Sequence, residues 1–200
     1  KSNISIKNYN HKNKGKLDEK CSLTLLNNAL ATGGFTLEVS KNYKFTKPLV
    51  IYNYFSKNLK ESIINNKNSI ILNADSGLTL INYFDDDSKY NFMTNTIDSI
   101  IIKKNASLKN IFINNSRCNG YFYRLTKSVL EKGSICDSYL LPTGLKFNKL
   151  DIEIDHNEEN SISSISSALN LSGSEHQEIK TRINHNAPNC QSYQKVKNVL

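Results

Sequence analysis

The side chains best suited to chemistry lie near the end of the chain, at Glu175, His176, His185 and Cys190. Imidazole, thiolate and carboxylate groups are ligands of iron and zinc, so these four residues are the candidate metal ligands of the sequence. Their spacing matches no established ligand pattern. The competing interpretation, which the sequence favours, is that they are turn and strand residues with Cys190 buried as a small apolar side chain.

Two acidic groups offer other chemistry. The Asp-Asp-Asp run at 85–87 suggests a calcium loop or the acidic site of a pectin-cleaving enzyme, but it lacks the spaced oxygen ligands of an EF-hand and fits a solvated turn better. Asp151, Glu153 and Asp155 alternate along one strand, so neighbours lie roughly 7 Å apart on the same face. Paired carboxylates are what glycoside hydrolysis needs, but a charged outer face explains these three as well.

The remaining motifs do not indicate an enzyme. The sequence has no Ser-His-Asp order, nucleophile elbow or glycine-rich phosphate loop, so we predict no catalytic residues. Four cysteines lie far apart and form no Cys-x-x-Cys pair, which argues against a zinc ribbon or a thioredoxin motif: Cys21, Cys118, Cys136 and Cys190. This usage predicts a reducing, cytoplasm-like compartment.

Composition narrows the range of partners. The formal net charge is +8, but the Lys residues are scattered among many Asn and Ile. No arginine-rich stripe interleaved with aromatics is present, so we predict no nucleic-acid partner. No apolar run reaches the roughly 18–20 residues of a membrane span, and the first residues lack the apolar core of a signal peptide, so we predict no membrane partner.

The elements that position these residues begin after a polar stretch. Residues 1–17 carry too little apolar surface to offset the cost of ordering, which predicts a flexible basic arm. Residues 18–34 predict a helix that covers one end of the fold. Three leucines share one face of this helix and a glycine pair stops it: Leu23, Leu26, Leu30, Gly33 and Gly34.

From Phe35 onward the apolar period is two, which predicts an all-β core over residues 35–200. Most turns hold three to five Asn or small residues and recur every 10–14 positions, which favours a β-helix over a sandwich with tight hairpins. The predicted strands cover 35–39, 49–55, 69–72, 78–84, 97–102, 108–114, 121–130, 134–141, 145–154, 162–171, 177–184 and 192–200. Aromatic residues within them are expected to form ladders or caps, or to mark a partner surface: Tyr52, Tyr54, Phe112, Tyr121 and Tyr123.

Several segments resemble the SufD branch of the SufB/SufD family, scaffold subunits of the SUF iron–sulfur cluster assembly system. The most specific is SEHQEIKTRINHNAPNCQSYQ, in which Glu-His, Thr, His, Pro, Cys and Ser stand in register. The others are LTLLNNALATGG, GGFTLEVSKNYKFTKPLVI, NSIILNADSGLTLINYF and YRLTKSVLEKGSICDSYLLPTG. One departure is Lys197-Asn198, which stands where the family has Lys-Gly.

The resemblance implies a right-handed parallel β-helix that continues beyond Leu200. It implies a non-catalytic scaffold that pairs with a SufB-like subunit and, through a missing C-terminal part, with a SufC-like ATPase. We expect no cofactor bound by this chain itself, an iron–sulfur cluster or iron in the full complex, and a cytoplasmic location, or a plastid one in a eukaryote.

The resemblance leaves alternatives open. Cys118 and Cys136 are candidate sulfur carriers, since sulfide traffic in the family uses cysteine, but isolated thiols are the simpler interpretation. A carbohydrate-active β-helix enzyme and a purely structural β-solenoid are the alternative functions. An ATPase partner would separate the scaffold from both.

Overall fold

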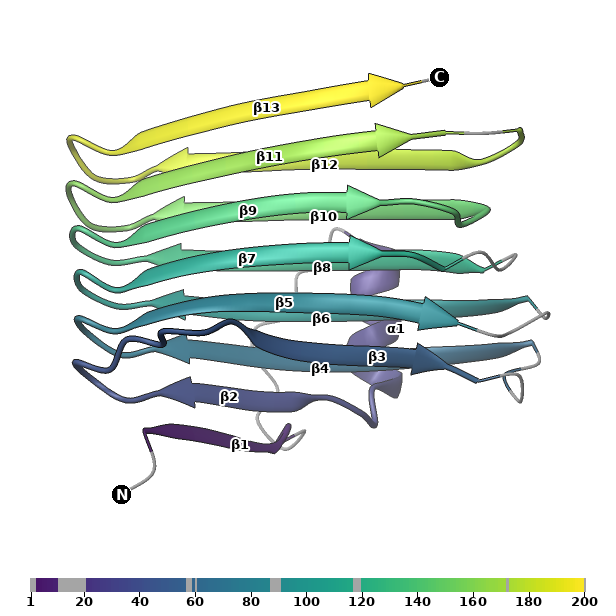
Figure 1. The fold of residues 1–200 in the computed structure, drawn as a ribbon, viewed down its shortest axis with the longest axis horizontal. Coiled ribbons are helices and arrows are strands. Elements are labelled where there is room, and N and C mark those ends of the chain that lie inside the picture. The colour runs from purple at the N-terminus through teal and green to yellow at the C-terminus, as the bar shows by residue number, and fades with distance from the viewer. Residues whose placement is uncertain are drawn as a thin grey trace.

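The computed structural model describes residues 3–10, 21–56, 59, 61–86, 91–116, 120–171 and 173–199. Within them the chain forms thirteen strands and one helix, α1 (Ser22–Leu30) (Figure 1). The strands are β1 (Ile4–Asn8), β2 (Phe35–Val39), β3 (Leu49–Phe55), β4 (Ser62–Leu72), β5 (Gly77–Asp86), β6 (Phe92–Ile102), β7 (Ser107–Asn114), β8 (Tyr121–Leu130), β9 (Ile135–Pro142), β10 (Phe147–His156), β11 (Ile162–Asn170), β12 (His176–His185) and β13 (Gln191–Val199).

Successive strands alternate between two facing sheets. Sheet A has the order β1-β2-β4-β6-β8-β10-β12, and sheet B has the order β13-β11-β9-β7-β5-β3. All neighbours pair in parallel except β1 and β2, which are antiparallel. The chain therefore rises as a right-handed β-solenoid (Figure 1), which confirms the predicted parallel β-helix and excludes the hairpin sandwich.

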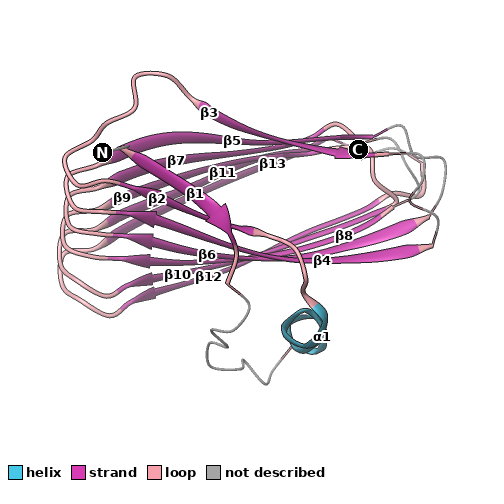
Figure 2. Ribbon diagram, turned by 90° about the horizontal axis from the view of Figure 1, so that it is seen from below, coloured by secondary structure: helices cyan, strands magenta, loops and turns pink. Residues whose placement is uncertain are grey.

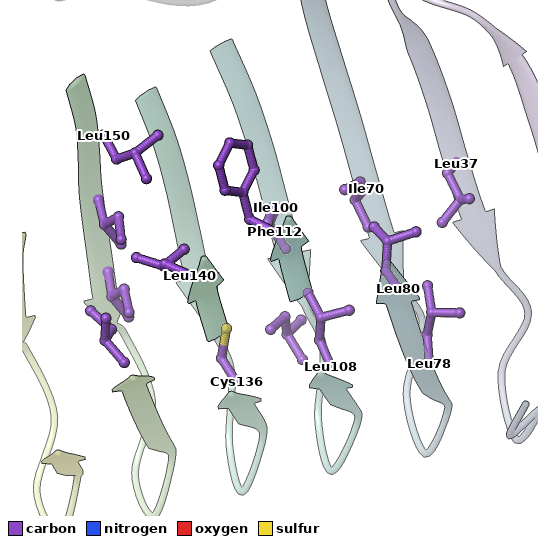
Figure 3. Packing of buried hydrophobic residues seen from close by; sticks show 14 of the residues in the cluster. Leu37, Ile70, Leu78, Leu80, Ile100, Leu108, Phe112, Cys136, Leu140 and Leu150 are labelled. Atoms are coloured by element: carbon purple, nitrogen blue, oxygen red, sulfur yellow. The ribbon is translucent and has the colours of Figure 1, made fainter. Parts of the chain in front are cut away.

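Inward side chains stack into ladders along the column. In sheet B, Leu78 pairs with Leu108 and Leu108 with Cys136, and all three are buried (Figure 3). In sheet A, Leu37 pairs with Ile70 and Ile70 with Ile100. Burying one such aliphatic side chain stabilises the fold by about 1.5–3 kcal/mol, so these ladders hold the two sheets together.

The turns along one side of the column share a backbone conformation. Each holds one residue with a left-handed φ, and these residues are Asn42, Asp75, Asn105, Gly133, Asn160 and Asn189. Asn, Asp and Gly adopt this conformation at low cost, which explains the turn composition. The Asp75 amide donates to the Lys104 carbonyl oxygen at 2.9 Å, and the Asn105 amide donates to that of Lys132 at 2.9 Å, so each turn stacks on the next.

Two N-terminal features differ from the prediction. Residues 4–8, expected within a flexible arm, form β1 and pair with β2, because alternation of Ile4 and Ile6 suits a strand at the edge of sheet A. Helix α1 does not cover an end of the column but lies along the outer face of sheet A (Figure 2). Asn27 holds it there, because its side-chain amide donates to the carbonyl oxygens of Asn66 at 3.0 Å and Asn95 at 2.7 Å.

The strand predictions hold closely except in sheet A, where β4 and β6 begin earlier than predicted. Their first halves, 62–68 and 92–96, are rich in Asn and Thr and were not predicted as strand. Thr94 is nevertheless buried in the interior, and Asn95 is buried under α1, where its side-chain amide donates to the Leu23 carbonyl oxygen at 2.8 Å. Within the described residues, no helix has the length and apolar character that a membrane crossing requires.

Candidate functional site

The four candidate metal ligands do not lie at one point. Glu175 and His176 stand at the start of β12, and His185 ends the same strand. Nine residue steps of extended chain separate the two histidines by roughly 30 Å. At its own end, the His176 ring stacks on Phe147 with centroids 4.9 Å apart. The four candidate ligands therefore do not meet at one site, because an extended strand carries its two ends to opposite sides of the column.

His185 instead belongs to a ladder on the inner face of sheet A. The register runs from Leu72 through Ile102 and Leu130 to His156, and from His156 to His185. The aliphatic ladder thus changes to imidazole in the last two coils of sheet A. The His156 ring is fully buried, and its centroid lies 4.8 Å from that of His185.

Two serines hold His156 in place. Its Nδ1 lies 2.7 Å from Ser161 Oγ and its Nε2 lies 2.9 Å from Ser163 Oγ. Ser161 Oγ also donates to the Glu158 carbonyl oxygen at 3.1 Å, so its lone pairs are left to accept from an Nδ1–H. This assigns the neutral Nδ1–H tautomer to His156, with Nε2 accepting from Ser163.

The surroundings of His156 oppose its protonation. Burial lowers the pKa of His156 below its usual value, and the neighbouring charge of His185 lowers it further. The neutral ring matches the serine hydrogen bonds, whereas an imidazolium would need two acceptors. The site therefore holds a buried, neutral His156, hydrogen-bonded to two serines, beside the exposed ring of His185.

Cys190 joins this group from the next turn. Its Sγ lies 3.4 Å from Ser161 Oγ and 3.4 Å from the Glu158 carbonyl oxygen. One coil later the arrangement recurs, because His185 Nε2 lies 3.1 Å from Ser192 Oγ. Cys190 is half-exposed rather than the buried apolar residue of the simpler interpretation. We call His156, Ser161, Ser163, His185 and Cys190 the histidine–serine cluster.

The sequence analysis missed His156 and its serines. The sequence does contain a regular spacing that would have identified them. Three pairs of residues lie 29 positions apart: Ser161 and Cys190, His156 and His185, and Ser163 and Ser192. Comparing residues at the spacing of one coil would have placed them together. In the part of the chain that the structure describes, no group of three His, Cys, Asp or Glu side chains is arranged to hold a metal ion.

The other cysteines differ in reactivity. Cys136 is fully buried in the sheet B ladder, and burial raises the pKa of its thiol to about 12, so it stays protonated. Cys21 precedes α1, where burial acts to raise its pKa but hydrogen bonds from Tyr123, Thr24 and Leu23 outweigh that effect and lower it. Cys118 lies outside the described residues.

The acidic strand residues form a charged outer face. Glu153 is bridged by two cations, with Lys127 Nζ at 3.2 Å and Arg182 Nη1 at 3.3 Å. Asp155 accepts from the Asn184 side chain at 2.7 Å, and Asp151 accepts from the Tyr123 hydroxyl at 3.1 Å. These carboxylates are held by partners on sheet A rather than facing one another.

The aromatic residues divide into core and surface groups. Phe112 and Tyr123 are buried, whereas Tyr52, Tyr54 and Tyr121 are exposed. Tyr52 stacks on Tyr83 of the next coil with centroids 5.4 Å apart, which is the expected ladder. Its hydroxyl donates to Asp85 at 3.1 Å, at the acidic run; Asp87 of that run lies outside the described residues.

The comparison with protein families bears on this solenoid directly. Residues 54–200 match the family model described as SUF system FeS cluster assembly, SufBD core domain. The chain belongs to the SufBD family. The SufBD match begins at the end of β3 and includes every later coil, together with the histidine–serine cluster. It confirms the resemblance to SufB and SufD and indicates a role in SUF iron–sulfur cluster assembly. A search of curated proteins found no match.

Proposed function

We propose that this SufBD protein is a SufD-type scaffold subunit that pairs with a SufB-like subunit and a SufC-like ATPase. The observation that carries the proposal is the match of residues 54–200, which covers the parallel coils from β4 to β13. The assignment to the SufD branch is supported by the segment at 174–194, whose His185 and Cys190 belong to the histidine–serine cluster.

The packing of the interior supports the proposed scaffold role. Ladders of packed aliphatic residues fill much of the column, and the buried thiol of Cys136 is protonated and unreactive. A rigid solenoid presents long flat outer faces to other chains. In this proposal the iron–sulfur cluster is the cargo of the assembled complex, the chain binds no cofactor of its own, and the complex acts in the cytoplasm or in a plastid.

Co-purification tests the proposal. The full-length protein carrying an affinity tag is isolated from its own cells, and the bound chains are identified by mass spectrometry. We expect a SufB-like chain and a SufC-like ATPase in comparable amounts. Isolation with a SufC-like ATPase and a second copy of this chain would support a SufB-type role instead, and isolation without any ATPase would overturn the scaffold assignment.

The carbohydrate-active alternative makes a different prediction. It needs two carboxylates that face one another across a substrate. Glu153 is bridged by Lys127 and Arg182, and Asp155 by Asn184, so none of these carboxylates is presented as such a pair. Purified protein is therefore expected to release no reducing sugar from pectin or from β-glucans.

A further inference from the structure

The interior of the column contains a cavity of about 260 Å³ near its N-terminal end. It lies beside the first half of the eleven-residue β4, which β2 does not reach and which meets the preceding chain in the isolated bridge between Gly33 and Asn66. Phenylalanine rings and polar side chains share its wall. They include Phe55, Phe84, Asn82, Thr94 and Arg124.

Arg124 is the distinctive group in this wall. The residue is 6% exposed, and its Nε donates to Asp98 Oδ2 at 2.5 Å. The guanidinium lies over the rings of Phe84, at 5.6 Å, and Phe112, at 5.2 Å. Its Nη1 is buried and has no hydrogen-bond partner among the residues that the structure describes. A buried guanidinium donor without an acceptor is unfavourable, because the group has lost its water and gained nothing in exchange.

Asp98, the carboxylate that pairs with Arg124, is not part of the cavity wall. Asp98 accepts from Arg124 through Oδ2 and from Asn68 Nδ2, at 2.8 Å, through Oδ1, so both carboxylate oxygens are occupied. Asp98 does not line the cavity, whereas Arg124 and Asn68 do. Among the described residues of the cavity wall, Arg124 is thus the one with a charge, and the cavity presents a cationic donor.

A second unsatisfied group lies in the same wall. The Thr94 hydroxyl is buried and has no partner, although it can donate or accept. The volume is below the roughly 300–1,000 Å³ of pockets for drug-sized ligands, so an occupant must be small. A single water would satisfy Arg124 but would leave the phenyl walls and most of the space unused.

We propose that this cavity binds a small organic carboxylate. Its carboxylate oxygens accept from the Arg124 guanidinium, which lines the cavity, and its carbon body packs against Phe55 and Phe84. Carboxylate is the natural partner of a guanidinium fork, and the aromatic wall favours an apolar body over a bare inorganic ion. The proposal is independent of the scaffold function, because it concerns the interior of this chain and no partner.

Benzoate is the probe, since it joins a carboxylate to a phenyl ring of suitable size. Isothermal titration and thermal unfolding are measured with benzoate, with neutral benzamide and with inorganic phosphate. We expect saturable binding of benzoate, a Tm that rises with its concentration, and at least about tenfold weaker binding of benzamide. Equal binding of benzamide, preferential binding of phosphate, or no saturation with benzoate would each overturn the proposal.

Two variants place the site. Ile51→Phe narrows the cavity and keeps the Arg124–Asp98 pair, and the double variant Asp98→Asn with Arg124→Met removes both charges, so neither is left unpaired. Both should lose benzoate binding at least tenfold while retaining the circular dichroism of a folded β protein. Arg182→Met on the outer face is the matched control and should bind as the original chain does. Undiminished binding by a folded Ile51→Phe protein would place the ligand elsewhere and refute the site.

Discussion

At the scale of single residues, the interior of this solenoid is unusually polar in two places. Near the N-terminal end Asp98 and Arg124 form a buried ion pair, and in the later coils His156 is enclosed by two serines. These contacts satisfy the two carboxylate oxygens of Asp98 and the two ring nitrogens of His156, which would otherwise destabilise an apolar interior. A change of pH tests the His156 site, and removal of charges by substitution tests the Asp98–Arg124 pair. In both cases the free energy of unfolding is measured.

The buried histidine makes stability depend on pH. Because the folded-state pKa of His156 is lowered, its stabilising contribution is complete above the unfolded pKa of about 6.5 and is lost as the pH falls through the lower folded-state pKa. We expect the free energy of unfolding, measured with urea, to fall between neutral pH and pH of about 5. His156→Gln should flatten this fall.

The control for that experiment lies on the neighbouring strand. His176→Gln changes an exposed histidine at the far end of β12 and should leave the pH dependence intact. An equal flattening by both substitutions would show that the pH dependence arises in the unfolded chain or at the surface, and not in the histidine–serine cluster.

The Asp98–Arg124 pair should show strong coupling in a double-mutant cycle. Arg124→Met alone leaves a buried carboxylate without its cation, which costs roughly 3–5 kcal/mol in comparable pairs. Adding Asp98→Asn removes that charge, so the double variant should be more stable than Arg124→Met. Additive losses in the free energy of unfolding would mean that the two charges do not depend on each other.

At the scale of elements, the stacked turns set the pitch of the coil. Gly133 has a φ of 64°, and a Cβ there would lie 2.7 Å from the Asn105 side-chain oxygen of the turn before it. Gly173 has a similar φ of 59° but nothing within 4 Å of such a Cβ. The two glycines thus share a backbone conformation and differ only in their neighbours.

Alanine substitutions at these two glycines separate the effects. Gly173→Ala should cost about 1–2 kcal/mol, the strain of a left-handed residue. Gly133→Ala should cost more, because Asn105 must also move from its hydrogen bond with Asp75. Thermal unfolding of both variants measures the difference. Equal losses would show that the turns are not held by side chains of adjacent coils.

The same scale shows what sequence patterns can predict. Alternating aliphatic residues identified β2 and β3 to the residue, since most of their inward positions are apolar or aromatic. The bounds of β8 were also predicted to the residue, although its inward positions include Arg124, Thr126 and Ser128. The first halves of β4 and β6 escaped, because their inward Asn and Thr residues look like loop until hydrogen bonds such as Asn68 to Asp98 join neighbouring coils. The pattern of apolar residues within one strand does not reveal hydrogen bonds between residues that lie about 30 positions apart in the chain.

The candidate site was predicted only in part for the same reason. His185 and Cys190 were identified by residue type and lie in the histidine–serine cluster. His156 was missed, since it stands one coil earlier in the chain and becomes a neighbour only through the register of β10 with β12. Glu175 and His176 do not lie with them, because β12 is extended and its two ends, His176 and His185, are far apart in space.

At the scale of the whole molecule, parallel coils build a column with two broad outer faces (Figures 1 and 2). Buried hydrophobic residues pack its interior. Helix α1 lies along sheet A. Several apolar side chains on the outer face of sheet B are exposed, namely Val50, Tyr52, Ile135, Tyr139 and Leu141. An architecture of this kind is suited to holding other chains in place, and SufBD membership supplies the process, SUF cluster assembly.

We propose that this chain supports cluster assembly without catalysing a reaction alone. Cluster formation is therefore to be followed by visible absorbance in a mixture of the SufB-like subunit, the SufC-like ATPase, ATP, iron and a sulfur donor, with and without the full-length protein. We predict that its omission lowers the yield of cluster several-fold, and that the protein alone neither hydrolyses ATP nor forms cluster. An unchanged yield without it would contradict the account.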